Sequence, residues 1–156
     1  MLTFETAQRV AAAVLDEGVR RRASALTVAV LDAGGHLVVL YRQDRAGYIR
    51  PEIAIGKAWG ALSLGVSSRG IAGIAAQFPA FFQALTVAAH GRMFPAPGGV
   101  LLRNPAGEVI GAVGVSGDSS DVDEALAIAA ASAAGLAPEP SRASAWEPPR
   151  AARAME

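Results

Sequence analysis

The sequence predicts an α+β domain in which helices cover an antiparallel sheet built from two β-hairpins. Two pairs of short, apolar, β-branched segments are each joined by a turn rich in Gly, Pro, Asp or Asn. Segments with the apolar spacing of helices precede, separate and follow these pairs. Strands do not alternate singly with helices, as they do in a doubly wound nucleotide-binding fold. The expected order is α-β-β-α-α-α-β-β-α.

The first helix and the first hairpin occupy the N-terminal part of the chain. Residues 4–21 have an apolar stripe at helical spacing, and Thr3 is placed to cap this helix. Residues 26–31 and 36–42 are predicted to be strands, because they are apolar or β-branched and a Gly-containing turn separates them.

Three helices are predicted in the middle of the chain, over residues 51–64, about 68–77 and 80–89. Pro51 suits the first turn of the first of these, and Phe78-Pro79 separates the other two. The helix over 51–64 is apolar nearly all round, which is typical of a buried helix.

The second hairpin and the closing helix follow. Residues 100–103 and 109–115 are predicted to be strands joined by a turn that contains Pro and Gly. The closing helix is expected over 120–134, with Ser119 or Ser120 as its cap and acidic residues in its first turn.

The composition favours one compact domain that binds neither nucleic acid nor membrane. The chain has 156 residues, 52% of them hydrophobic and 18% charged, with zero formal net charge and no cysteine. No basic patch, membrane-length apolar run or signal-peptide pattern is visible, so we expect a cytoplasmic protein. Residues 1–135 are expected to form the domain. Residues 136–156 are rich in Pro and Ala and are expected to be a flexible tail, with Trp146 as its only large side chain.

Lys57 is the only lysine among the 14 basic residues, and it lies within the apolar helix. A buried ammonium needs a partner or a path to water, since burial disfavours its charged form. Two interpretations are open. The long side chain reaches the surface, or it faces a ligand or acts in catalysis.

A candidate small-molecule site follows from His90, Arg92 and Lys57, which are polar groups in apolar surroundings. The loop after Arg92 would form the wall of this site, because its glycine pair allows a ligand to approach the backbone closely. The predicted wall residues are Met93, Phe94, Pro95, Gly98 and Gly99.

Two familiar motifs are not supported. The run from Gly114 to Asp118 nearly matches a serine-hydrolase nucleophile elbow, but Asp118 stands where that motif has glycine. The glycines at 111, 114 and 117 lack the spacing of a dinucleotide-binding loop. No His- or carboxylate-rich pattern indicates a structural metal.

Five motifs, in this order, resemble those of the GlcG/HbpS-like proteins, a family that includes the C-terminal domain of PduO adenosyltransferases and is often labelled haem-binding or haem-degrading. The similarity spans about residues 2–134. The motifs are Asp32-Ala33-Gly34-Gly35, Arg42-Gln43-Asp44, Ala54-Ile55-Gly56-Lys57-Ala58, Phe94-Pro95-Ala96-Pro97-Gly98-Gly99-Val100, and Gly111-Ala112-Val113-Gly114-Val115-Ser116-Gly117 with Asp123.

The resemblance implies an antiparallel sheet flanked by helices, a homo-oligomer between a dimer and an octamer, and a small-molecule site. It makes Lys57 and the Gly98-Gly99 loop family positions, and it adds Asp44 to the expected ligand-binding residues. Haem is the cofactor that it suggests, with His90 as the axial iron ligand and Arg92 and Lys57 as partners of carboxylates.

Three functions therefore remain open. The first is a binding protein for haem or another flat, anionic, largely apolar ligand. The second is a cofactor-independent lyase or isomerase in which Lys57 and His90 act as acid-base groups. The third is a scaffold or interaction protein in which the tail matters most.

Overall fold

The computed structural model describes residues 1–143 of the chain. The helices are α1 (Phe4–Arg20), α2 (Arg50–Leu64), α3 (Ser68–Gln77), α4 (Pro79–Ala88) and α5 (Ser120–Ala133). The strands are β1 (Thr27–Asp32), β2 (Leu37–Arg42), β3 (Gly99–Arg103), β4 (Val109–Ser116) and β5 (Ala137–Glu139).

The two predicted hairpins form one antiparallel sheet with the strand order β2-β1-β4-β3-β5. β1 and β2 form one hairpin and β3 and β4 the other, and β1 pairs with β4 to join them. In the register of that central pair, Thr27 lies opposite Ser116 and Val30 opposite Val113. The α+β class and the expected order of the first nine elements are confirmed.

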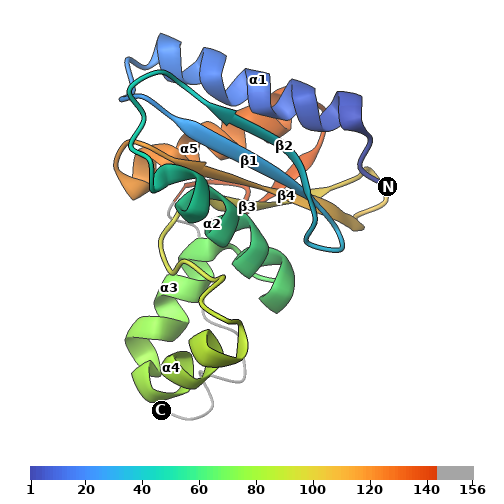
Figure 1. The fold of residues 1–156 in the computed structure, drawn as a ribbon. Coiled ribbons are helices and arrows are strands. Elements are labelled where there is room, and N and C mark those ends of the chain that lie inside the picture. The colour runs from blue at the N-terminus through green and yellow to red at the C-terminus, as the bar shows by residue number, and fades with distance from the viewer. Residues whose placement is uncertain (144–156) are drawn as a thin grey trace.

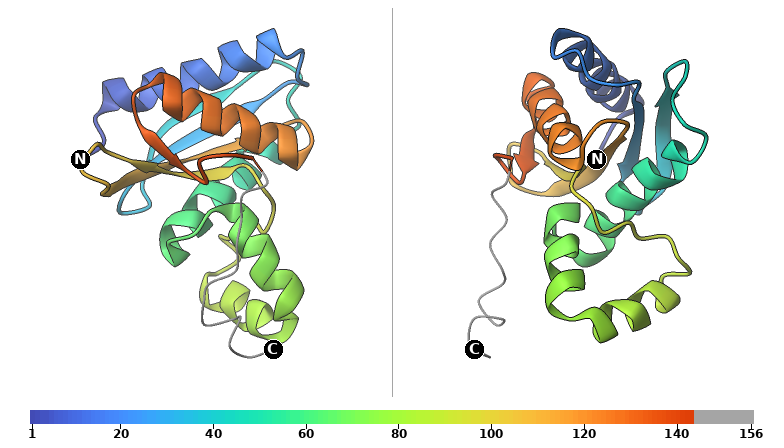
Figure 2. Two further views of the ribbon diagram at one scale, coloured as in Figure 1. Left: turned by 180° about the vertical axis from the view of Figure 1, so that it is seen from behind. Right: turned by 90° about the vertical axis from the view of Figure 1, so that its left-hand side faces the viewer.

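Helices cover both faces of the sheet (Figures 1 and 2). α1 and α5 lie together on one face, where Val28 and Val30 belong to the larger apolar core. α2 lies on the other face, against Ala29 and Leu31. This division follows from the strand period, since successive side chains point to opposite faces.

α2 lies unusually close to β4 because the residues between them are small. A Cβ added at Gly114 would lie 1.9 Å from the backbone oxygen of Ala54, so no larger residue fits there. Ala58 and Ala61 are also fully buried on this side of the helix. The close contact fixes the position of α2, on which the candidate site is built.

α3 and α4 form an arm that projects from the sheet (Figure 1). Ser67 caps α3 by accepting a hydrogen bond from the Gly70 N–H. α4 has no buried residue and contacts α3 alone among the helices and strands of residues 1–143. Its exposed apolar side chains include Phe81, which is 60% exposed, and Val87, which is 77% exposed.

The sheet differs from the prediction at its end. Residues 137–139, which were expected to begin a flexible tail, form β5 and pair with β3. An ion pair between Arg103 and Glu139, 2.6 Å from Nη2 to Oε2, holds this short strand in place. The folded domain therefore continues beyond residue 135. The remainder of the predicted tail, including Trp146, lies outside the described residues.

Candidate functional site

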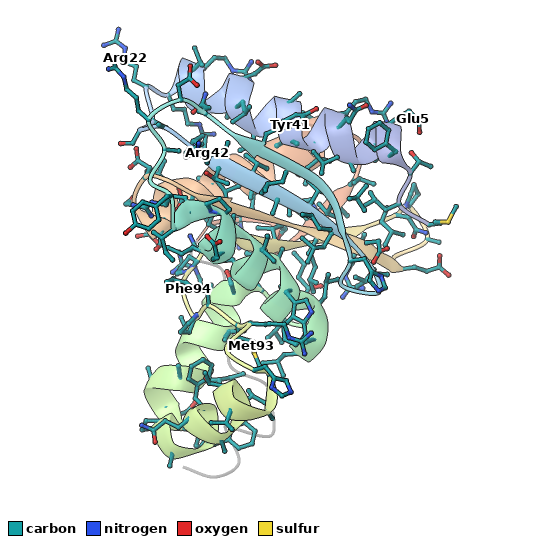
Figure 3. All side chains as sticks on the ribbon, in the orientation of Figure 1. Glu5, Arg22, Tyr41, Arg42, Met93 and Phe94 are labelled. Carbon is teal, nitrogen blue, oxygen red and sulfur yellow. The ribbon has the colours of Figure 1, made fainter. Side chains whose placement is uncertain are left out.

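The candidate site is an apolar cleft of about 410 Å³ between α2 and the segment that follows α4. This volume lies in the range of small-molecule sites. The cleft opens to solvent on one side, and Figure 3 shows Met93 and Phe94 on the segment below α2. Its lining residues are Ile49, Glu52, Ile53, Ile55, Gly56, Trp59, Gly91, Arg92, Met93 and Phe94.

Gly56 allows the two walls of the cleft to meet at its base. The Phe94 N–H donates a hydrogen bond to the Gly56 carbonyl oxygen, with N and O 3.3 Å apart. A Cβ added at Gly56 would lie 3.1 Å from the Arg92 carbonyl oxygen and 3.2 Å from the Phe94 Cβ. A larger residue at position 56 would push the segment away from the helix.

The charged edge of the cleft is an arginine that stacks on a tryptophan. The Arg92 guanidinium carbon lies 4.0 Å from the centroid of the Trp59 ring, and Arg92 Nε donates to the Ala89 carbonyl oxygen. Such a cation–π contact contributes about 0.5–1 kcal/mol at an exposed site. Arg92 has no carboxylate partner within residues 1–143, so its guanidinium retains donors for an anionic ligand.

Lys57 does not line this cleft, and its side chain does not reach the surface. It points from α2 toward the sheet and is 2% exposed. Its ammonium donates to the Val115 carbonyl oxygen at 2.8 Å and to Asp123 Oδ2 at 3.0 Å. Asp123 Oδ1 accepts a third hydrogen bond, from the Asp118 N–H. Lys57 therefore links α2, β4 and α5, and the interpretation that its side chain reaches the surface is wrong.

Burial governs the protonation of this pair. It lowers the pKa of the Lys57 ammonium and raises the pKa of the Asp123 carboxyl, while the attraction between the two groups acts in the opposite direction on each. Arg50, on the same helix, lowers the pKa of Lys57 further through charge repulsion. The pair is thus costly to bury, and its role is to fix three elements together.

The Gly98-Gly99 pair faces the protein's own backbone and not the cleft. A Cβ added at Gly98, where φ is +123°, would lie 2.9 Å from Lys57 Nζ. One added at Gly99 would lie 2.3 Å from the Lys57 carbonyl oxygen. The Gly99 N–H donates to Ser68 Oγ at 2.6 Å. The close approach predicted for a ligand is instead made by α2.

His90 lies in the turn after α4 and is exposed, with a positive φ of 53°. It directly precedes Gly91, which lines the cleft, but is not itself a lining residue. The acid-base hypothesis needs Lys57 and His90 in one site. The cleft contains neither residue, and the Lys57 ammonium is already bound to protein groups.

Of the other predicted site residues, three line the cleft and two lie outside it. Arg92, Met93 and Phe94 all line the cleft. Pro95 is half-buried and is not among the lining residues. Asp44 is exposed beside a broad, open trough at the edge of β2, away from the other predicted residues.

Most of the α2 wall was missed by the sequence analysis, above all Trp59, Ile53 and Glu52. A signal for it was present. A helix that is apolar nearly all round has a second face to cover besides the one on the sheet. Trp59 and Ile53 lie on that second face, and the segment from Gly91 to Phe94 covers it only in part.

Within residues 1–143 the structure contains neither a candidate metal centre nor a membrane-spanning helix. No group of three or more His, Cys, Asp or Glu side chains is placed to hold a metal ion. Among the helices described there, none has the length and apolarity to cross a membrane.

The structure is an α+β domain with an apolar cleft, and comparison with known proteins places it in a family. The chain belongs to the HbpS-like family, because the family model described as "Haem degrading protein HbpS-like" matches residues 2–132. A search of curated proteins found no match.

Solved structures have the same fold. The Klebsiella pneumoniae protein ORFY is 30% identical, with a TM-score of 0.77, over 86% of this chain and 90% of that one. A double mutant of Streptomyces reticuli HbpS is 29% identical, with a TM-score of 0.72, over 85% of this chain and 86% of that one. A PduOC:haem complex is 24% identical, with a TM-score of 0.77, over 86% of this chain and 96% of that one, and shows the fold alone.

Proposed function

We propose that this protein binds haem, or a flat and largely apolar molecule with a carboxylate, in the cleft between α2 and residues 91–94. The observation that carries the proposal is the Arg92–Trp59 stack at the edge of an apolar cleft. A flat apolar ligand would bury its face against Ile53 and Phe94. Its carboxylate would pair with the Arg92 guanidinium, which forms such contacts through two N–H groups at once. Membership of an HbpS-like family supports haem as the first ligand to test.

The residues of the cleft fit part of a haem group. The apolar lining suits the macrocycle, and the open side leaves room for the portion that 410 Å³ does not enclose. Haem ligands in proteins include His and Met. Met93 lines the cleft and His90 stands one residue outside it, so these are the two candidate axial ligands. Bound haem would supply iron-centred redox and oxygen chemistry.

A haemin titration followed in the Soret region tests this proposal. We expect saturable binding with one equivalent per chain, and at least tenfold weaker binding for Arg92→Gln. His90→Ala and Met93→Leu are compared with the wild type, since the variant that loses its axial ligand changes the Soret spectrum. Non-saturating binding that is the same in the wild type and Arg92→Gln would rule out the cleft as a haem site.

We also propose that the protein is a homo-oligomer, as its resemblance to the family implies. The apolar surface of α4 supports this, because Phe81 and Val87 are large, apolar and exposed. Light scattering coupled to gel filtration gives the mass directly. Phe81→Glu is expected to reduce that mass, and an unchanged mass would show that α4 is outside any interface. The cytoplasmic location expected from the sequence stays a prediction.

A further inference from the structure

A row of three polar residues crosses the end of the sheet on the face that α2 covers. Thr27 lies at the start of β1, directly opposite Arg42 on β2 and Ser116 on β4. Residues directly opposite in antiparallel strands share a face, with Cβ atoms about 4.5–5.5 Å apart. Further along the same face β1 has only Ala29 and Leu31. The polar row is thus confined to one end.

The two hydroxyl groups of the row are fully buried, and one has no partner. Thr27 Oγ1 makes no hydrogen bond within the described residues, although its side chain is 0% exposed. Ser116 Oγ accepts a hydrogen bond from Arg50 Nη1 at 3.2 Å, and the structure gives its own proton no acceptor within residues 1–143. Buried polar groups nearly always have a partner, and one that lacks it calls for an explanation.

The charge around these hydroxyls is positive. Arg42 is exposed and donates to the Ala46 carbonyl oxygen, while Arg50 is half-buried and donates to Ser116. Neither guanidinium pairs with a carboxylate in the part of the chain that the structure describes. Each has five N–H donors, so most of them remain available.

Of the acidic groups near this end, two are already engaged, while Asp44 and Glu52, each two residues beyond one of the arginines, are exposed. Asp123 is bound to Lys57. The Asp118 carboxylate accepts the N–H groups of Ser24 and Ser119.

We propose that a small oxyanion, either inorganic phosphate or a short carboxylate, binds at this end of the sheet. Its oxygens would accept hydrogen bonds from Arg42, Arg50 and the hydroxyls of Thr27 and Ser116. Arg42 is exposed, so the anion would have to reach the two buried hydroxyls from the side of this arginine. The site is independent of the proposed haem cleft, because that cleft is built on another face of α2.

Isothermal titration calorimetry at constant ionic strength tests the proposal, with inorganic phosphate in one series, sodium acetate in another and sodium chloride as the blank. We expect saturable binding of phosphate or acetate to the wild type. Arg50→Gln and Thr27→Val should each weaken it at least tenfold. Arg9→Gln removes the same charge from the exposed face of α1 and should leave it unchanged. The series that saturates identifies the anion.

Absence of saturable heat with both anions would overturn the proposal, as would equal affinity in Thr27→Val and the wild type. A melting experiment provides a second readout, with circular dichroism to show that each variant is folded. The bound anion should raise the wild-type Tm, and the increase should be lost in Thr27→Val. An increase of the same size in Thr27→Val would place the anion elsewhere and refute the site.

Discussion

Replacing Lys57 by Met tests whether this lysine is a structural link. Lys57 and Asp123 are 2% and 1% exposed, and their charged atoms are 3.0 Å apart. Removing one partner of a buried ion pair costs about 3–5 kcal/mol, because the other charge stays buried without compensation. For Lys57→Met we expect a cost at the lower end of this range. Asp123 keeps the hydrogen bond from the Asp118 N–H, and its raised pKa favours protonation once Lys57 is gone. We therefore expect a loss of about 3 kcal/mol.

A double-mutant cycle separates the interaction energy of the Lys57–Asp123 ion pair from the other contributions of the Lys57 side chain to stability. Asp123→Asn alone leaves the buried Lys57 ammonium without the carboxylate charge that it contacts. The variant with both changes buries no charge at this position. Its loss in the free energy of unfolding should therefore be clearly smaller than the sum of the losses in the two single variants. The expected coupling energy is about 1–3 kcal/mol, as for directly contacting groups. Urea unfolding followed by circular dichroism gives the free energies.

The control is Arg9→Met, which removes an exposed cation from α1 and should change stability by less than about 0.5 kcal/mol. A Lys57→Met loss below about 1 kcal/mol, or additivity in the cycle, would refute the buried link. The folded Lys57→Met variant should also bind haemin as the wild type does, because Lys57 does not line the cleft.

Three further predictions concern other parts of the fold. Gly114→Ala should destabilise the protein by about 3 kcal/mol or more in urea unfolding, because its Cβ would overlap the Ala54 oxygen; a loss under about 1 kcal/mol would show that α2 moves freely. Ser119→Ala should cost about 1 kcal/mol in the same assay by removing the cap of α5, and an unchanged midpoint would contradict this. The pKa of Asp118 lies below its ordinary value of 3.8, because the Ser24 and Ser119 N–H groups stabilise the carboxylate. Its stabilising effect is therefore complete above that value and is lost as the pH falls through the lower folded pKa, so the stability gap between the wild type and Asp118→Asn should shrink from pH 7 to about pH 3. A gap that stays constant over that range would contradict the assignment.

Local structure was readable from the sequence because its causes are local. Thr3 caps α1 through a hydrogen bond from the Thr6 N–H three residues on. Pro79 separates α3 from α4, since its ring fixes φ and removes a donor. The two hairpins follow from apolar segments on either side of a tight turn. Each of these signals lies within a few residues of its effect.

The partners of Lys57 and of Gly98 could not be read in this way. Lys57 and Asp123 are 66 residues apart in the chain, and the sequence does not show which carboxylate meets a buried lysine. A glycine pair accommodates a ligand or a neighbouring helix equally well, and here it accommodates α2. β5 escaped prediction because a strand of three residues containing Pro138 has no apolar alternation to detect.

Binding of the ligand in the cleft between α2 and residues 91–94 is tested most directly by the fluorescence of Trp59. Trp59 lines the cleft, and Trp146 is the other tryptophan of the chain, so a Trp146→Phe background isolates the signal. In that background haemin should quench the fluorescence saturably. Arg92→Gln should raise the Kd at least tenfold, and the matched change Arg103→Gln, on β3 and outside the cleft lining, should leave it unchanged. Quenching that does not saturate, or an equal Kd in both variants, would contradict the claim.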